Sequence, residues 1–287
     1  MKVKIPRKNI IVKIILYYLK EITNNEKFNF AIYSNDYIGR NLVFKDFYEE
    51  ENLSLFQKFL KINNIHIKNF VDIGANIGNH SVYFSKFVCN VYAFEPSSKA
   101  FELLKINTKK NNIKLYQVGI SNKNCTSLLA ESKFNLGGSN IIKKIKKNHT
   151  FTEKIKLIKL DNYKNFINKK IDLIKIDTEG HELNVLKGTE KIIDKNLPII
   201  ILEQNAYDVK KNQSKVINFL AKKNYVFYNI SSTLFTSKIF FFKLCSILMH
   251  LIFPKSVKFE KIDYKNMIKK DYTFIVALNQ KLENYIK

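Results

Sequence analysis

The chain has 287 residues, of which 46% are hydrophobic, and a formal net charge of +24 at pH 7. The length suits one large α/β domain or two small ones, and the hydrophobic content is ordinary for a globular protein. The lysines are spread over the whole chain, and their tightest cluster, Lys143–Lys147, is short. This even spread, with no RNA- or DNA-binding motif beside it, argues against a nucleic-acid partner, and an anionic ligand or an anionic membrane surface is the better match for the charge.

Cysteine usage indicates the compartment. Three cysteines, Cys89, Cys125 and Cys245, are widely spaced, and no Cys-x-x-Cys pair or Cys/His cluster accompanies them. This pattern argues against a disulfide framework and against a zinc site. We therefore expect a reduced, cytoplasmic setting, with attachment to a membrane surface as an alternative.

The N-terminal segment, residues 1–22, is basic and then apolar. Its apolar part is interrupted by Lys13 and is followed by no small-residue cleavage site, which favours an amphipathic helix over a signal peptide. We predict that residues 1–68 form an N-terminal helical extension and that residues 69–287 form the main domain.

Short apolar runs bounded by turn residues alternate with helical patterns along the main domain. The runs that predict strands are 69–74, 90–96, 114–120, 171–180, 198–205, 225–230 and 271–279. Helical periodicity covers residues 97–111 and 181–195. Strands that alternate with helices predict a mostly parallel sheet with helices on both faces.

The turn after the first strand, FVDIGANIGNH at residues 70–80, indicates a ligand site. Gly74 and Gly78 suit a turn that leads from a strand into a helix, and Asn76 stands where a dinucleotide fold has its middle glycine. Asp72 precedes the turn and can accept a hydrogen bond from a loop amide or a ligand amine. Glu95 ends the second strand, where a carboxylate can accept both hydroxyls of a ribose. These residues predict a nucleoside cofactor without a diphosphate, such as S-adenosylmethionine; an ordinary β–α turn is the alternative.

The chain resembles the FkbM-type methyltransferases between Asn69 and Gln204. The motifs that carry the resemblance are VDIGANIGNHSVYFSK (71–86), VYAFEPSSKAFELLKIN (91–107), GGSN (137–140), LIKLDNY (157–163) and IDLIKIDTEGHELNVLKG (171–188). The resemblance implies a Rossmann-like class I methyltransferase fold, with a seven-stranded, mostly parallel sheet and an antiparallel last strand. It also implies S-adenosylmethionine as methyl donor and a hydroxyl acceptor on a sugar, a glycan, a lipid-linked compound or a natural product.

The resemblance also implies roles for individual residues. It assigns Asp72, Gly74, Asn76 and Gly78 to the cofactor loop, Glu95 to the ribose contact with Ser97 beside it, and residues 117–124 to the adenine side.

The segment IKIDTEGHE holds the candidate catalytic residues. Asp177 falls at the carboxyl end of a strand, where open α/β sheets bind ligands, and Glu179 and His181 follow in the next turn. Methyl transfer to an alcohol requires alignment and a proton acceptor, so we predict His181 as the base and Asp177 as its partner or as a cofactor contact. A cation held by Asp177 and Glu179 is an alternative way to acidify the hydroxyl. His80 is expected to be structural or a cofactor-side contact, and Ser139 to lie in a loop over the site.

Two other classes of function compete with a methyltransferase. A nicotinamide-dependent oxidoreductase lacks support because the middle glycine is absent and no Tyr-x-x-x-Lys pair is suitably placed. A non-catalytic protein that retains the fold is disfavoured by the intact loop, Glu95 and Asp177.

A hydrophobic insertion is predicted at residues 231–270. Its central segment, Lys238–Phe253, would place apolar residues on one face of a helix. The apolar runs of this segment are too short to span a bilayer. The alternatives are a cap over the acceptor site, a helix in a membrane interface, and a plain structural insertion.

Overall fold

The computed structural model describes residues 30–33, 36–42, 46–109, 112–131, 138–142, 151–232 and 257–283. The predicted helix in residues 1–22, the lysine cluster at 143–147 and the segment 238–253 lie outside these ranges. Within the described ranges, no helix has the length and apolar character needed to cross a membrane.

The described elements follow one another in the order that the sequence predicts, with additions. They are α2 (Tyr37–Leu42), α3 (Glu50–Ile62), β1 (Asn69–Ile73), α4 (Asn79–Phe84), β2 (Asn90–Phe94), α5 (Ser98–Asn107), β3 (Ile113–Tyr116), β4 (Gly119–Ile120), β5 (Cys125–Glu131), β6 (Asn140–Ile142), β7 (Phe151–Ile158), η2 (Leu160–Asn162), β8 (Leu173–Ile176), α6 (Glu182–Gly188), α7 (Glu190–Asn196), β9 (Ile199–Gln204), η3 (Ala206–Asp208), α8 (Lys215–Ala221), β10 (Tyr225–Ser232), β11 (Val257–Lys261), β12 (Tyr272–Asn279) and α10 (Gln280–Glu283).

The main sheet has eight strands in the order β11-β10-β12-β9-β8-β1-β2-β3. Strands β3, β2, β1, β8 and β9 are parallel, and β12 runs antiparallel between β9 and β10. The expected Rossmann-like α/β fold with an antiparallel last strand is confirmed. The sheet has one strand more than the seven expected, because β11, which lies within the predicted insertion, adds an antiparallel edge strand beside β10.

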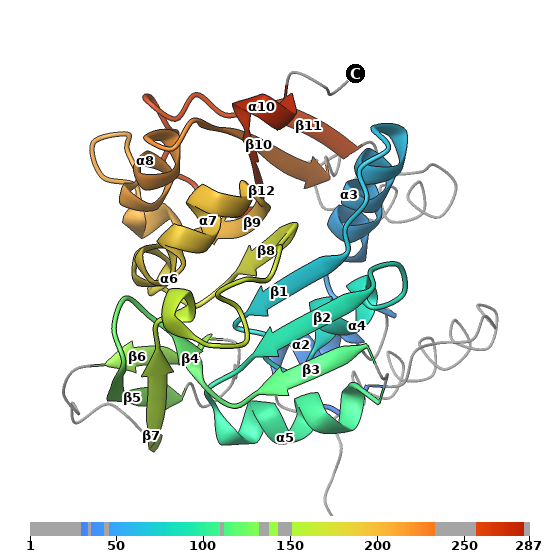
Figure 1. Ribbon diagram of the computed structural model, residues 1–287, viewed down its shortest axis with the longest axis vertical. Helices are drawn as coiled ribbons and strands as arrows, with labels where there is room; N and C mark the ends of the chain where they lie inside the picture. Colours follow the sequence, from blue (N-terminus) through green and yellow to red (C-terminus); the bar gives the residue numbers. More distant parts are fainter. Residues whose placement is uncertain are drawn as a thin grey trace, which may run out of the picture.

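Helices cover both faces of this sheet, which explains why its central strands are apolar on both sides (Figure 1). On one face α6, α7 and α8 contribute Leu186, Ile193 and Leu220 to a continuous core with β1, β8 and β9. On the other face α3, α4 and α5 bury residues such as Phe56 and Phe84. Helix α3, which belongs to the predicted N-terminal extension, therefore packs directly on the sheet.

A second, smaller sheet in the order β4-β7-β5-β6 was not predicted. The single strand expected at residues 114–120 divides into β3 of the main sheet and β4 of the small one. The helical pattern at residues 181–195 also divides, into α6 and α7. The hydroxyl of Thr189 donates to the Val185 carbonyl at 3.0 Å where α6 ends. The small sheet extends the carboxyl edge of the main sheet and helps to enclose the site described below (Figure 1).

Candidate functional site

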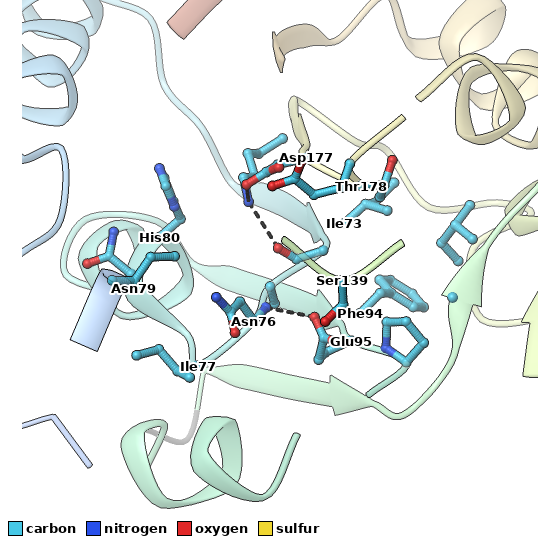
Figure 2. Close-up of a pocket in the computed structure, with 18 of the residues that line it drawn as sticks. Ile73, Asn76, Ile77, Asn79, His80, Phe94, Glu95, Ser139, Asp177 and Thr178 are labelled. Atoms are coloured by element: carbon cyan, nitrogen blue, oxygen red, sulfur yellow. Dashed lines mark hydrogen bonds and ion pairs between the residues drawn. The ribbon is translucent and has the colours of Figure 1, made fainter. Parts of the chain in front are cut away.

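A pocket lies where the strand order reverses between β1 and β8 (Figure 2). It is lined by residues that follow β1, β2 and β8, including Asn76, Glu95 and Asp177. Open α/β sheets bind ligands at this edge. Gly119 and Ile120 of the predicted adenine segment and Ser139 of the predicted loop also line it.

The turn after β1 has the backbone conformation that its glycines predict. Gly74 and Gly78 have φ angles of 79° and 95°. A Cβ on Gly74 would lie 1.8 Å from the Asp177 carbonyl oxygen, and a Cβ on Gly78 would lie 2.8 Å from Cδ1 of Leu104. Gly74 is therefore required by the close approach of the Asp177 backbone, and Gly78 by the close approach of α5. Space for a ligand is not the only reason for a glycine at either position.

Asn76 supplies the clearest sign of an absent partner. Its backbone is in the left-handed region, with φ 49°. Both polar atoms of its side chain are buried and have no hydrogen-bond partner within the described part of the chain. Because buried polar groups are normally satisfied, the Asn76 amide is available to a ligand in the pocket that it lines (Figure 2).

Glu95 is buried, and its carboxylate ties the loop after β1 to the start of α5. One oxygen accepts the backbone N–H of Asn76 at 2.8 Å and the other accepts the N–H of Ser97 at 2.9 Å. A carboxylate has about four acceptor sites, so one site on each oxygen remains for a ligand. Burial raises the pKa of Glu95 to about 7, against the opposing effect of the two backbone hydrogen bonds. The residues present therefore fit a nucleoside with two neighbouring hydroxyls.

The structure places two predicted cofactor residues beside the pocket and not on its wall. Asp72 is fully buried; its carboxylate accepts the Ser81 hydroxyl at 2.7 Å and lies 3.6 Å from Nζ of Lys175. Burial raises the pKa of Asp72. Ser97 is buried and its hydroxyl accepts the N–H of Ala100, so it caps α5. Neither residue lines the pocket, because Asp72 faces α4 and Ser97 faces its own helix.

Asp177 and Glu179 both line the pocket, as predicted. The Asp177 carboxylate is 3.2 Å from Nζ of Lys175, and its side chain remains 28% exposed. Glu179 has φ 49°, and burial together with the charges of Asp177 and Glu182 raises its pKa to about 7. In the described ranges no three His, Cys, Asp or Glu side chains are grouped as metal ligands. A cation held by Asp177 and Glu179 would therefore have these two carboxylates and no third such side chain from the described residues.

His181 does not reach this pocket. Its ring nitrogens lie 2.9 Å from the Ser121 hydroxyl and 3.2 Å from the Asn184 amide, and the residue lines a separate hollow beside β5. The turn between Asp177 and α6 explains this separation. Gly180 has φ 92° and its N–H donates to Glu182, so the chain turns away before His181. His181 therefore lies apart from Asp177, and its role as the base stays a prediction from the sequence.

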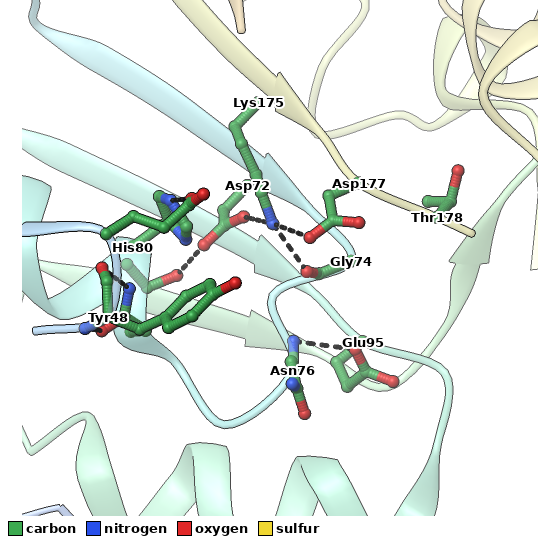
Figure 3. Close-up of polar contacts among 12 residues, drawn as sticks. Tyr48, Asp72, Gly74, Asn76, His80, Glu95, Lys175, Asp177 and Thr178 are labelled. Atoms are coloured by element: carbon green, nitrogen blue, oxygen red, sulfur yellow. Dashed lines mark hydrogen bonds and ion pairs between the residues drawn. The ribbon is translucent and has the colours of Figure 1, made fainter. Parts of the chain in front are cut away.

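Two pocket residues, Tyr48 and Lys175, were not assigned from the sequence, and His80 was expected to be structural or a cofactor-side contact. His80 lines the pocket from the first turn of α4, and its Nε2 lies 3.7 Å from the carboxylate of Glu49 (Figure 3). Tyr48 also lines the pocket and is held by Asn79, which exchanges two hydrogen bonds with its backbone at 2.9 and 3.0 Å. Burial lowers the pKa of His80 well below its usual value and raises that of Glu49 to about 8.

Lys175 is the second residue that was missed. It lies within β8, which is otherwise apolar, and a lysine in such a strand is the signal that could have identified it. Its ammonium contacts both Asp177 and the backbone of Gly74.

Comparison with known proteins identifies the family. The sequence profile of the domain described as Methyltransferase FkbM domain matches residues 72–227. This region is more than half of the chain and includes the turns that line the pocket after β1, β2 and β8. The chain belongs to the FkbM methyltransferase domain family. The resemblance seen in the sequence motifs is thereby confirmed.

Individual relatives are more distant. The hexuronic acid methyltransferase AglP of Haloferax volcanii is 29% identical over 153 residues, which cover 51% of this chain and 60% of that protein. The methyltransferase sdnD of Sordaria araneosa is 28% identical over 156 residues, covering 42% of this chain and 60% of that protein. The chain therefore spans about 60% of the length of these curated relatives. Among solved structures, the methyltransferase FkbM from Methylobacillus flagellatus KT is 20% identical, with a TM-score of 0.40 over 60% of this chain and 40% of that one.

Proposed function

We propose that this FkbM-family chain is an S-adenosylmethionine-dependent methyltransferase that acts on a hydroxyl group. The observation that carries the proposal is the Glu95 carboxylate, which ends β2 at the pocket with one acceptor site free on each oxygen. The unpartnered Asn76 amide on the adjoining turn supports it. The bound cofactor supplies an electrophilic methyl group on a sulfonium centre.

The chain itself must orient the acceptor and accept its proton. Asp177, Glu179 and His80 line the pocket and are the candidates for this role. His80 is the histidine that we favour over His181, because burial keeps its imidazole neutral and Glu49 lies beside it. Asp177 stays our candidate for orienting the acceptor at the carboxyl end of β8.

The acceptor that we propose is a hydroxyl on a sugar, a glycan, a lipid-linked compound or a natural product. The relative named hexuronic acid methyltransferase supports a sugar acceptor, although the match covers only part of both proteins. The division at residue 68, the function of the insertion at 231–270 and a peripheral membrane contact stay predictions from the sequence. Liposome flotation with anionic vesicles at low salt tests the membrane contact.

Ligand-dependent stabilisation tests the proposed function. Thermal unfolding is measured with S-adenosylhomocysteine, with NAD and with neither, and we expect a concentration-dependent shift with the first alone. Calorimetry should give a micromolar dissociation constant for S-adenosylhomocysteine. Stabilisation by NAD instead would select the oxidoreductase, and no response to either ligand would favour a non-catalytic protein.

A further inference from the structure

Lys175 is a buried charge in the centre of the main sheet. All four residues of β8 are buried, and Lys175 is 4% exposed. An ammonium group in such a place is costly unless carboxylates and hydrogen-bond acceptors surround it. Burial alone would lower the pKa of Lys175, but the charges of Asp177 and Asp72 outweigh burial and raise it. The two carboxylates therefore favour the charged form of this side chain.

The register between β1 and β8 places Lys175 beside its first partner, Asp72. Asp72 in β1 is directly opposite Lys175 in β8, and neighbouring residues of parallel strands project from the same face of a sheet. Asp72 is fixed on its other side by the Ser81 hydroxyl of α4 at 2.7 Å. The ammonium lies 3.6 Å from the Asp72 carboxylate, so this pair anchors Lys175 to β1.

The other two partners of Lys175 belong to the pocket. Its Nζ donates to the Gly74 carbonyl at 3.0 Å and to the Asp177 carboxylate at 3.2 Å (Figure 3). The ammonium therefore donates two hydrogen bonds, to the turn after β1 and to the carboxylate after β8, and forms an ion pair with Asp72 of β1. One side chain thus connects the turn assigned to the cofactor with the carboxylate assigned to the acceptor.

We propose that Lys175 is a positioning residue that fixes the Asp177 carboxylate relative to the turn at Gly74, so that cofactor binding depends on both contacts together. The inference rests on the proposed function, because it treats the pocket as the cofactor site. It adds a residue outside the predicted catalytic set, and it implies that the effects of altering Lys175 and Asp177 are not independent.

A double-mutant cycle on ligand binding tests the proposal without an acceptor. The wild type, Lys175→Met, Asp177→Asn and the double variant are titrated calorimetrically with S-adenosylhomocysteine. We expect Lys175→Met to weaken binding at least tenfold. The turn loses the hydrogen bond at the Gly74 carbonyl, and the carboxylates of Asp72 and Asp177 are left near each other without a cation between them. The double variant should bind better than the product of the two single effects predicts, because Asp177→Asn removes one of these charges.

Two controls separate positioning from general stability. Lys223→Met removes a lysine that pairs with Glu190 and Asp194 at the surface, and it should leave ligand affinity unchanged. Leu220→Ala creates a cavity in the core beneath α8; it should lower the melting temperature without changing affinity. If Lys175→Met does not fold, Asp72→Asn/Lys175→Met removes the uncompensated buried charge while the contacts to Gly74 and Asp177 stay absent.

The outcomes are distinct. Folded Lys175→Met or Asp72→Asn/Lys175→Met protein that binds S-adenosylhomocysteine within twofold of wild type overturns the inference and leaves the proposed function intact. Strictly multiplicative effects of Lys175→Met and Asp177→Asn also overturn it. A wild type that does not bind S-adenosylhomocysteine overturns both the inference and the proposed function.

Discussion

Replacing Glu95 with alanine removes a carboxylate that accepts two backbone N–H groups and still offers one acceptor site on each oxygen. Two ligand hydroxyls that lose this acceptor cost about 2 kcal/mol in total, which is about 30-fold in Kd. The Asn76 N–H, left unpaired at the pocket, adds about 1 kcal/mol and brings the expected loss to about 150-fold. We therefore expect Glu95→Ala to weaken S-adenosylhomocysteine binding by about 30- to 150-fold.

The pH dependence of binding gives a second, independent measurement. The pKa of Glu95 is raised to about 7, and the ionised carboxylate is the form that accepts both hydroxyls. Affinity should therefore fall as the pH drops through 7, by about tenfold between pH 8 and pH 6. The alanine variant should lack this contribution, and the groups that titrate nearby, such as Glu179, should be common to both proteins.

Isothermal titration calorimetry at pH 6, 7 and 8 measures both effects. Glu102→Ala on the exposed side of α5 is the matched control, because Glu102 pairs only with Lys105 among the ion pairs described. Its Kd should equal that of wild type. An unchanged affinity of folded Glu95→Ala at pH 8 would refute the assignment of Glu95 to the ligand and the estimate built on its two remaining acceptor sites.

Three further predictions concern the turn, the chemistry and the stability of the site. Gly74→Ala places a methyl group 1.8 Å from the Asp177 carbonyl at a positive φ, so ligand binding measured by calorimetry should be abolished; retained affinity would contradict the geometry of the turn. Asp177→Asn should reduce methyl transfer by about 10²–10⁴-fold if its charge orients or deprotonates the acceptor, measured by mass spectrometry on a hydroxylated acceptor; normal turnover would exclude that role. The pKa of Glu49 is raised to about 8, so the stability that it contributes is present at acidic pH and is lost as the pH rises through 8. The melting temperature of the wild type should therefore fall between pH 6.5 and 9. Over the same range the free energy of unfolding should decrease by about 2 kcal/mol less in Glu49→Gln than in the wild type; an identical pH profile in the variant would contradict the burial of this carboxylate.

Local pattern in the sequence was sufficient to predict the outline of the site. Carboxyl ends of parallel strands meet at one edge of a sheet, so Asn76, Glu95 and Asp177 could be predicted to approach one another from their positions after apolar runs. The small sheet was missed although β7 alternates Ile155 and Leu157 with lysines, because a two-residue period in a lysine-rich segment resembles a charged loop.

Strand periodicity and glycine conformation are local properties, so they were enough to predict the fold class and the turn that begins the pocket. Which side chains face the pocket depends instead on how distant segments of the chain pack together. His181 lies outside the pocket because the backbone turns at Gly180. His80 lies beside Glu49 because α4 packs against the loop before α3. The contact of Lys175 with its partners depends on strand register, which is set by pairing between distant segments and cannot be read from either strand alone.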